Sequence, residues 1–126
     1  MKIRPATVDD APAISALIRP LTQAFVAGEL TAEAAARLLE SMEAASIRKY
    51  ILSGYRYHVA EEDGKIVGAV AVKENSHLYH LFVSRDFQGR GLARQLWEAA
   101  KGASLAAGNR GRFTVHSSLG AAGLYE

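Results

Sequence analysis

The middle of the chain carries three apolar-rich segments separated by polar turn residues. They are residues 55–62 ("YRYHVAEE"), 65–73 ("KIVGAVAVK") and 77–84 ("HLYHLFVS"). Their length and their content of β-branched and aromatic residues are typical of strands. The "DG" at 63–64 is a hairpin signal, and "ENS" at 74–76 predicts a second turn. We therefore predict three consecutive strands.

Helical periodicity precedes these strands. One apolar face is formed by residues at i, i+3, i+4 and i+7, namely Ile14, Leu17, Ile18 and Leu21. Thr7, Asp9 or Asp10 can cap this helix, and Pro20 is expected near its end. An alanine-rich region from Thr31 to Leu52, closed by Gly54, is also helical and forms one helix or two.

A further helix is predicted after the three strands, from about Gly91, with Gly108 as a stop signal. Its apolar face consists of Leu92, Leu96, Ala99, Ala100 and Ala103. Residues 2–7 and 112–118 read as first and last strands, and 119–126 begin a last helix. The order β-α-α-β-β-β-α-β-α predicts an α/β fold, a mixed sheet with helices on both faces, in a single domain of residues 1–126.

Composition narrows the class of protein. The chain has 49% hydrophobic and 22% charged residues, no cysteine and a net charge of +2, which fits a globular protein with neither disulfides nor a thiolate zinc site. No apolar run approaches a membrane helix, and "MKIRPATVDD" lacks a signal peptide, so we expect a cytoplasmic protein with no membrane partner. Residues 85–112 hold six basic and two acidic residues. This excess suits a small polyanionic ligand better than nucleic acid.

The basic segment surrounds a glycine loop, "QGRGLA" at residues 88–93. A helix N-terminus offers unpaired amides to a phosphate, and glycine allows the backbone to approach the ligand. The loop lacks the GK[ST] of a Walker loop. It also lacks the third glycine of the dinucleotide fingerprint, since Arg94 stands there. From these residues alone, a phosphate site and an ordinary strand-to-helix turn both remain open.

The wider segment "LYHLFVSRDFQGRGLARQLWEAA" resembles the acetyl-CoA-binding segment of the GCN5-related N-acetyltransferase (GNAT) superfamily. Gln88, Gly91 and Ala93 occupy its Q/R-x-x-G-x-G/A positions. "HSSLGAAGLYE", with Tyr125, is similar to a later segment of the family, and "IRPATVDDAPAI" to its usual opening. The resemblance implies the acyl-CoA N-acyltransferase fold, a mostly antiparallel sheet flanked by helices.

The sequence departs from the family pattern at its end. Relatives continue past the tyrosine with "K-x-G-F" and two further strands, whereas this sequence stops at Glu126. We therefore expect the C-terminal strands of the fold to be missing. The chain is then a fragment, its tail lies beyond the printed sequence, or a partner chain, such as a second copy in a homodimer, completes the sheet.

The resemblance implies an N-acetyltransferase that moves the acetyl group of acetyl-CoA to an amine by direct attack. The amides of residues 88–93 (Gln88, Gly89, Arg90, Gly91, Leu92 and Ala93) would cradle the pyrophosphate, with charge from Arg90 and Arg94. The backbone of Leu81, Phe82 and Val83 would pair with the pantetheine arm, and the Leu81 N–H would bind the thioester carbonyl. Tyr125 would protonate the departing thiolate. The acceptor would be a small-molecule or peptide amine; the alternative is a CoA-binding module without catalysis.

The general base is less defined. Relatives often place it about four residues before the Leu81 position, which here is His77. An ordinary pKa near 6.5 suits a histidine base. Strict alternation would put His77 and Leu81 on one face and His80 on the other. His80, His116 and a water chain stay open as alternatives. No histidine pair has metal-site spacing, so we expect no metal, and we interpret Glu61, Glu62 and Asp63 as a solvated turn.

Overall fold

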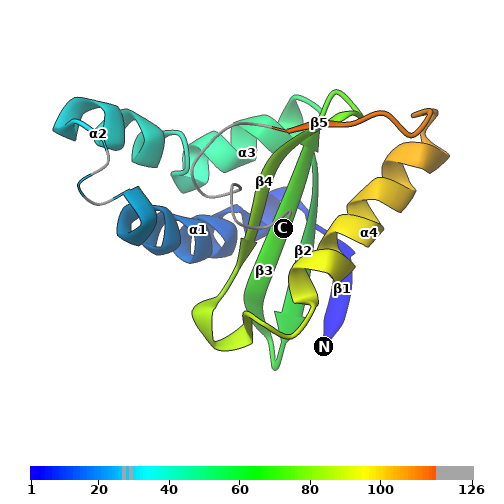
Figure 1. Cartoon of the computed structure of the whole chain (residues 1–126), viewed down its shortest axis with the longest axis horizontal. Coiled ribbons are helices and arrows are strands. Elements are labelled where there is room, and N and C mark those ends of the chain that lie inside the picture. The colour runs from blue at the N-terminus through cyan, green and yellow to red at the C-terminus, as the bar shows by residue number, and fades with distance from the viewer. Residues whose placement is uncertain (27, 29, 116–126) are drawn as a thin grey trace.

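A five-stranded sheet forms the centre of the computed structural model, which describes residues 1–26, 28 and 30–115 (Figure 1). The strand order follows the chain order: β1 (Lys2–Pro5), β2 (Arg56–Glu62), β3 (Lys65–Lys73), β4 (His77–Val83) and β5 (Thr114–Val115). The first four strands are antiparallel neighbours, whereas β5 runs parallel to β4. The chain therefore builds a meander first and adds β5 by a crossover.

The predicted strands of the meander are confirmed. β3 has the predicted bounds, and β2 and β4 are each shorter than predicted by one residue. Asp63 (φ 50°) and Gly64 (φ 78°) both have positive φ, the backbone of a type I′ hairpin turn. Glu74 and Asn75 also have positive φ and turn the chain from β3 into β4.

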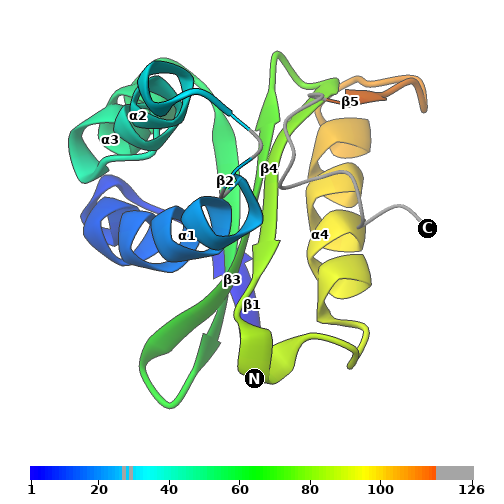
Figure 2. The ribbon, with the colours of Figure 1, turned by 60° about the vertical axis from the view of Figure 1, so that its left-hand side comes forward.

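Helices cover both faces of the sheet (Figure 2). One face carries α1 (Ala11–Val26), α2 (Ala32–Glu40) and α3 (Ala44–Leu52), and the other carries α4 (Leu92–Ala106). The region from Thr31 to Leu52 is thus two helices. Short 3₁₀ turns, η1 (Val8–Asp10) and η2 (Arg85–Phe87), lead from β1 into α1 and from β4 toward α4.

The prediction that α1 ends near Pro20 is wrong, because the helix continues to Val26. Proline removes one backbone hydrogen bond from the turn before it, a cost that packing against the sheet can offset. Ile14 and Ile18, from the predicted apolar face, are fully buried. Tertiary burial therefore outweighs the local break that proline introduces.

Two apolar cores lie on the two faces of the sheet. The core under α1 and α3 contains Ile14, Ile18, Ile47, Tyr57, Val59, Ala69, Ala71 and Phe82. The core under α4 contains Val67, Val70, Val72, Leu78, Leu81, Val83, Leu92, Leu96 and Ala100. Strands β2, β3 and β4 thus contribute side chains to both layers, as expected for a sheet between helices.

Helix α4 approaches the sheet closely at Gly68 in β3. A Cβ atom built on Gly68 would lie 2.7 Å from Cδ1 of Leu96, well inside ordinary van der Waals contact. Leu96 is fully buried, so it has little space into which to move. Gly68 therefore sets how near α4 lies to β3.

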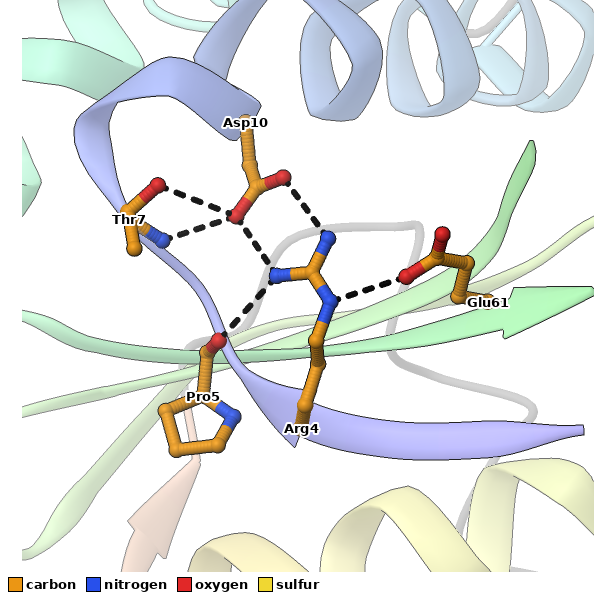
Figure 3. A network of polar contacts seen from close by, with 5 residues as sticks. All are labelled: Arg4, Pro5, Thr7, Asp10 and Glu61. Carbon is orange, nitrogen blue, oxygen red and sulfur yellow. Dashed lines mark hydrogen bonds and ion pairs between the residues drawn. The ribbon is translucent and has the colours of Figure 1, made fainter. Parts of the chain in front are cut away.

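A polar network joins β1, η1 and β2 (Figure 3). The Arg4 guanidinium donates to both carboxylate oxygens of Asp10 and, through Nε, to Oε1 of Glu61 at 2.9 Å. Asp10 also accepts the Thr7 backbone N–H at 2.8 Å, and Thr7 is the N-cap residue of η1. The interpretation of Glu61 as part of a solvated turn is wrong, because its carboxylate is held by Arg4.

The end of the chain is described only in part. The predicted strand 112–118 is present as Thr114–Val115. The predicted last helix, with His116 and Tyr125, lies outside the described residues. Within residues 1–26, 28 and 30–115, no helix combines the length and the apolar character that crossing a bilayer requires.

Candidate functional site

A β-bulge in β4 shapes the region around the predicted acetyl-transfer centre. In the pairing with β3, Ala71 faces His80 and the next residue, Val72, faces Leu78, so Tyr79 is the extra residue. Leu78, Leu81 and Val83 belong to the core under α4, while Tyr79 and Phe82 pack in the core under α1 and α3. Residues at the two bulge positions point to the same side of a strand.

The bulge overturns the expectation that His77 and His80 lie on opposite faces. His80 pairs with Ala71, which belongs to the core under α1 and α3. His77 pairs with Lys73, whose ammonium lies 5.7 Å from the centre of the Tyr55 ring on that same side. Because paired residues in antiparallel strands share a face, both histidines lie on the face that α1 and α3 cover.

The end of β4 is buried on its faces and partly open along one edge. Leu81, Phe82 and Val83 have almost no exposed side-chain surface, and β3 pairs with all three. On the other edge, β5 pairs with His77 and Leu78. Within the described residues, no strand pairs with that edge from Tyr79 to Val83. This is where the pantetheine arm was expected to pair with backbone.

The glycine loop after η2 is exposed and tightly turned. Gly89 (φ 77°) and Gly91 (φ 76°) both adopt the left-handed conformation, which costs glycine little and other residues more. A Cβ atom on either glycine would meet no protein atom within 4 Å, so the space beside the backbone is open. The loop therefore presents bare backbone to the outside, as a phosphate-binding turn requires.

Helix α4 begins directly after Gly91, its N-cap residue. Its first hydrogen bond runs from the Gln95 N–H to the Gly91 carbonyl at 3.1 Å. The amides of Leu92, Ala93 and Arg94 thus belong to the first turn of α4, where an N–H has no helical carbonyl one turn earlier to accept its hydrogen bond. These amides carry the positive end of the helix dipole. The Arg90 guanidinium lies 5.4 Å from the centre of the Phe87 ring and adds charge beside this turn.

The Gln88 side chain has a role that sequence reasoning missed. Its Nε2 donates to the carbonyl of Val83 at 2.9 Å and so ties the loop to the end of β4. The glycine loop and the strand edge are therefore held in a fixed relation. The glutamine at this motif position was noticed in the sequence, but its bond to Val83 depends on the path of the loop.

His77 lies at the start of β4, beside the first residue of β5. Its Nδ1 is 2.6 Å from Oγ1 of Thr114, the residue with which it pairs. The ring is therefore held at the end of the sheet, four residues along the strand from Leu81. The structure brings His77 to the face of the sheet that also carries Tyr79 and His80.

His80 lies at the bulge, next to Leu81, and is 3% exposed. Its Nδ1 is 3.0 Å from the hydroxyl of Tyr57 in β2, which is also buried. Tyr50, Tyr55 and Tyr79 pack together nearby, with ring centres 4.8–5.5 Å apart. The sequence did not indicate this grouping, because its members are brought together only by the pairing of β2, β3 and β4 and by α3.

His58, the third histidine of the described residues, lies on the opposite face of the sheet from His77 and His80. His58 pairs with Val70, so it faces the core under α4, and its Nδ1 is buried without a hydrogen-bond partner. Burial, and secondarily the charge of Arg56, lowers the pKa of His58. Within the described ranges, no three His, Cys, Asp or Glu side chains gather closely enough to hold a metal ion. Tyr125, the predicted proton donor, lies outside the described residues.

Comparison with known families identifies a match over most of the chain. Residues 26–126 match a family described as "Acetyltransferase (GNAT) domain". The matched range includes β2 to β5, the bulge, the glycine loop and α4. A search of curated protein sequences finds no match.

Solved structures with a similar fold include proteins described as acetyltransferases. A GCN5-related N-acetyltransferase from Rhodopseudomonas palustris superimposes with a TM-score of 0.78 at 24% identity, covering 98% of this chain and 77% of that one. The PaiA N-acetyltransferase from Thermoplasma acidophilum, solved with coenzyme A, gives 0.71 at 16% identity over 85% and 73%. An aminoglycoside acetyltransferase from a soil metagenome, solved with sisomicin, gives 0.64 at 20% identity over 92% and 76%.

Proposed function

This chain belongs to the GNAT family of acetyltransferases, and we propose that it transfers the acetyl group of acetyl-CoA to a primary amine by direct attack. The family assignment supports acyl transfer in general. Acetyl-CoA as donor and a primary amine as acceptor are the specific content of the proposal. The relative solved with coenzyme A supports the choice of donor.

The observation that carries the proposal is the joint geometry of the glycine loop and β4. Gly89 and Gly91 present open backbone at the start of α4, and Gln88 fixes that loop to the end of the strand. A ligand with a pyrophosphate followed by a long arm containing amide groups would meet both features in one extended pose. Coenzyme A has this chemistry: the pyrophosphate would bind the first-turn amides, and the pantetheine arm would lie along the strand edge.

The residues of the site take distinct roles in the proposed reaction. The amides of residues 88–93 bind the pyrophosphate, and Arg90 and Arg94 contribute positive charge. The Leu81 N–H would stabilise the oxyanion that develops on the thioester carbonyl. Tyr125 would give a proton to the leaving thiolate. His77, which the sequence predicts as the base, lies on the bulged strand β4.

Two measurements, made one after the other, test the proposal. Calorimetry with acetyl-CoA and with desulfo-CoA should show binding of both, because the loop recognises the shared pyrophosphate. A free-thiol assay with acetyl-CoA over a panel of amines, small molecules and peptides should then show release that depends on the amine. Absence of binding would contradict the proposed site. Binding without thiol release on any amine would instead support a CoA-binding module, which the lack of a carboxylate in β4 favours.

A further inference from the structure

The bulge of β4 brings a histidine and a tyrosine together beside the expected thioester position. We infer that His80, positioned by Tyr57, takes the proton from the acceptor amine during acetyl transfer. This inference rests on the proposed function and assigns to His80 the role that the sequence had given to His77. In this assignment His80 is the catalytic residue and Tyr57 is a positioning residue that acts through it.

The first support is the position of His80 along the strand. His80 directly precedes Leu81, whose N–H is the proposed donor to the thioester carbonyl. His77 is four residues away, roughly 13 Å at about 3.3 Å per strand residue. A base must come within hydrogen-bonding distance of the attacking nitrogen, directly or through one water. His80 therefore starts close to the reacting atoms, whereas the His77 ring is held by Thr114 at the other end of the strand.

The second support is the bond between His80 and Tyr57. The Tyr57 hydroxyl lies 3.0 Å from Nδ1 of His80, and both side chains are at least 97% buried. This contact fixes the ring orientation. The proposed role requires the neutral tautomer in which Nδ1–H donates to the Tyr57 oxygen, because only then does Nε2 have a free lone pair to take the proton, directly or through a hydrogen-bonded neighbour. When His80 gains a proton, its Nδ1–H donates to the Tyr57 oxygen, which stabilises the imidazolium.

The surroundings keep Tyr57 suited to this role. Burial, with a smaller contribution from Tyr79, Tyr50 and Tyr55, raises the pKa of Tyr57. Its hydroxyl therefore stays neutral and can accept from an imidazolium without ionising itself. Among the described residues, Tyr79 of β4 packs against the His80 ring with ring centres 4.5 Å apart, and Tyr50 of α3 and Tyr55 of the α3–β2 connection pack against Tyr79. The Lys73 ammonium lies over the Tyr55 ring of this cluster, 5.7 Å from the ring centre.

The proposed step balances atoms and charge. The amine nitrogen attacks the thioester carbonyl carbon, and its lone pair forms the new C–N bond. One N–H proton passes to Nε2 of His80. The C–S bond breaks, its electron pair leaves with sulfur, and the thiolate takes a proton, in the proposal from Tyr125. His80 then loses its proton to solvent, and Tyr125 regains one. The products are the N-acetyl compound and coenzyme A thiol.

The kinetic test compares pH–rate profiles of wild-type protein and variants with the most active amine. In wild type, kcat/KM should fall at acidic pH as the base becomes protonated. His80→Gln should lower kcat about 100-fold or more, the usual scale of general-base loss, and abolish this acid limb. Tyr57→Phe should lower kcat about tenfold and move the limb to lower pH, because the imidazolium loses its acceptor. His77→Gln should keep the limb.

Matched controls separate chemistry from folding. Tyr55→Phe removes a hydroxyl from the same aromatic cluster without touching His80 and should stay within about twofold of wild type. His80→Gln and Tyr57→Phe should bind acetyl-CoA with wild-type affinity, measured by calorimetry. The inference is overturned if His80→Gln keeps the acid limb, or if His77→Gln alone loses it.

A second measurement needs no turnover and so separates this inference from the proposed function. Imidazole NMR titration should show His80 gaining a proton as the pH falls, at a lower pH in Tyr57→Phe than in wild type, because the imidazolium loses its acceptor. If no amine releases thiol, the proposed function fails and the titration still decides the His80–Tyr57 pair. A His80 signal that shows no protonation over the pH range in which the protein stays folded, or that is unchanged by Tyr57→Phe, overturns the inference.

Discussion

The guanidinium of Arg4 and the carboxylate of Asp10 form a two-point ion pair, with Nη1 2.9 Å from Oδ2 and Nη2 3.0 Å from Oδ1. The pair fixes the chain reversal between β1 and α1, and both side chains are less than one-third exposed. The Arg4 guanidinium, through its hydrogen bonds to the carboxylate, holds the pKa of Asp10 below its usual range.

We expect Asp10→Asn to lower the free energy of unfolding by about 1–2 kcal/mol, because it removes the charge that Arg4 binds in a partly buried site. Urea denaturation at pH 7 measures the effect. Asp9→Asn is the matched control, because Asp9 is the exposed neighbour, and it should change stability by less than about 0.5 kcal/mol. Equal effects of the two substitutions would show that the ion pair contributes nothing specific.

Gly68→Ala should destabilise the protein by about 1–2 kcal/mol, because the new methyl group overlaps with Leu96 in the core under α4. Gly102→Ala provides the opposite case. Gly102 lies on the exposed side of α4 with open space around it, so alanine should stabilise the helix by about 0.5–1 kcal/mol. Thermal or urea unfolding of both variants checks the pair, and a neutral Gly68→Ala would mean that Leu96 can move aside.

Gly91→Ala and Gly64→Ala separate backbone strain from ligand binding. The two glycines have nearly the same φ, 76° and 78°, and both have open space at the Cβ position. Each substitution should cost about 1–2 kcal/mol of stability, the usual cost of placing alanine in this conformation. Gly91→Ala should also weaken acetyl-CoA binding by about tenfold or more, since the methyl group stands where phosphate would bind. Calorimetry showing equal affinity for both variants would contradict the assignment of the loop.

Stability should fall on acidification partly through His58. Its pKa is lowered in the folded state, mainly by burial, so the unfolded chain binds a proton first as the pH falls. The loss therefore begins near pH 6.5, continues until the pH reaches the folded pKa, and has a slope of at most about 1.4 kcal/mol per pH unit. The difference between the urea midpoints at pH 7 and pH 5 should be smaller in His58→Leu than in wild type. An unchanged pH dependence in that variant would assign the acid sensitivity to other groups.

Tyr125→Phe tests the proposed proton donor to the thiolate. Because only the hydroxyl is removed, kcat for acetyl transfer should fall by about tenfold or more while acetyl-CoA affinity stays within about twofold of wild type. Tyr50→Phe is a control for the same chemical change elsewhere in the chain and should leave kcat unchanged within about twofold. Undiminished turnover by Tyr125→Phe would remove this residue from the mechanism.

Much of the fold could be predicted because its signals are local. The "DG" turn at 63–64, the glycine before α4 and the stop at Gly108 each reflect a backbone preference of one or two residues. The prediction from Pro20 was wrong because it used only a local signal. Proline indicates a break in the helix, but burial of the helix face against the sheet outweighs that break. The split between α2 and α3 was left open because the alanine-rich sequence favours helix throughout.

The site was less predictable because its arrangement depends on strand pairing. Strict alternation separates His77 from His80, and nothing in "HLYHLFV" marks Tyr79 as the bulged residue. The contact between Tyr57 and His80 spans 23 positions of the chain, so only the register of β2, β3 and β4 reveals it. The glycine loop, by contrast, is a continuous segment, and its residues could be named from the sequence.

The parallel pairing of β5 with β4 has a consequence for synthesis of the chain. β4 is complete at Val83, but its neighbour Thr114 is added only after the whole of α4 has been made. Ribosomes add about 5–20 residues per second, whereas a helix forms in about a microsecond, so α4 can dock on the sheet before β5 exists. The newly made chain therefore carries an open strand edge for a second or more. Such edges promote association between nascent chains, and α4 leaves this one open, because it packs on a face of the sheet and not along the edge of β4.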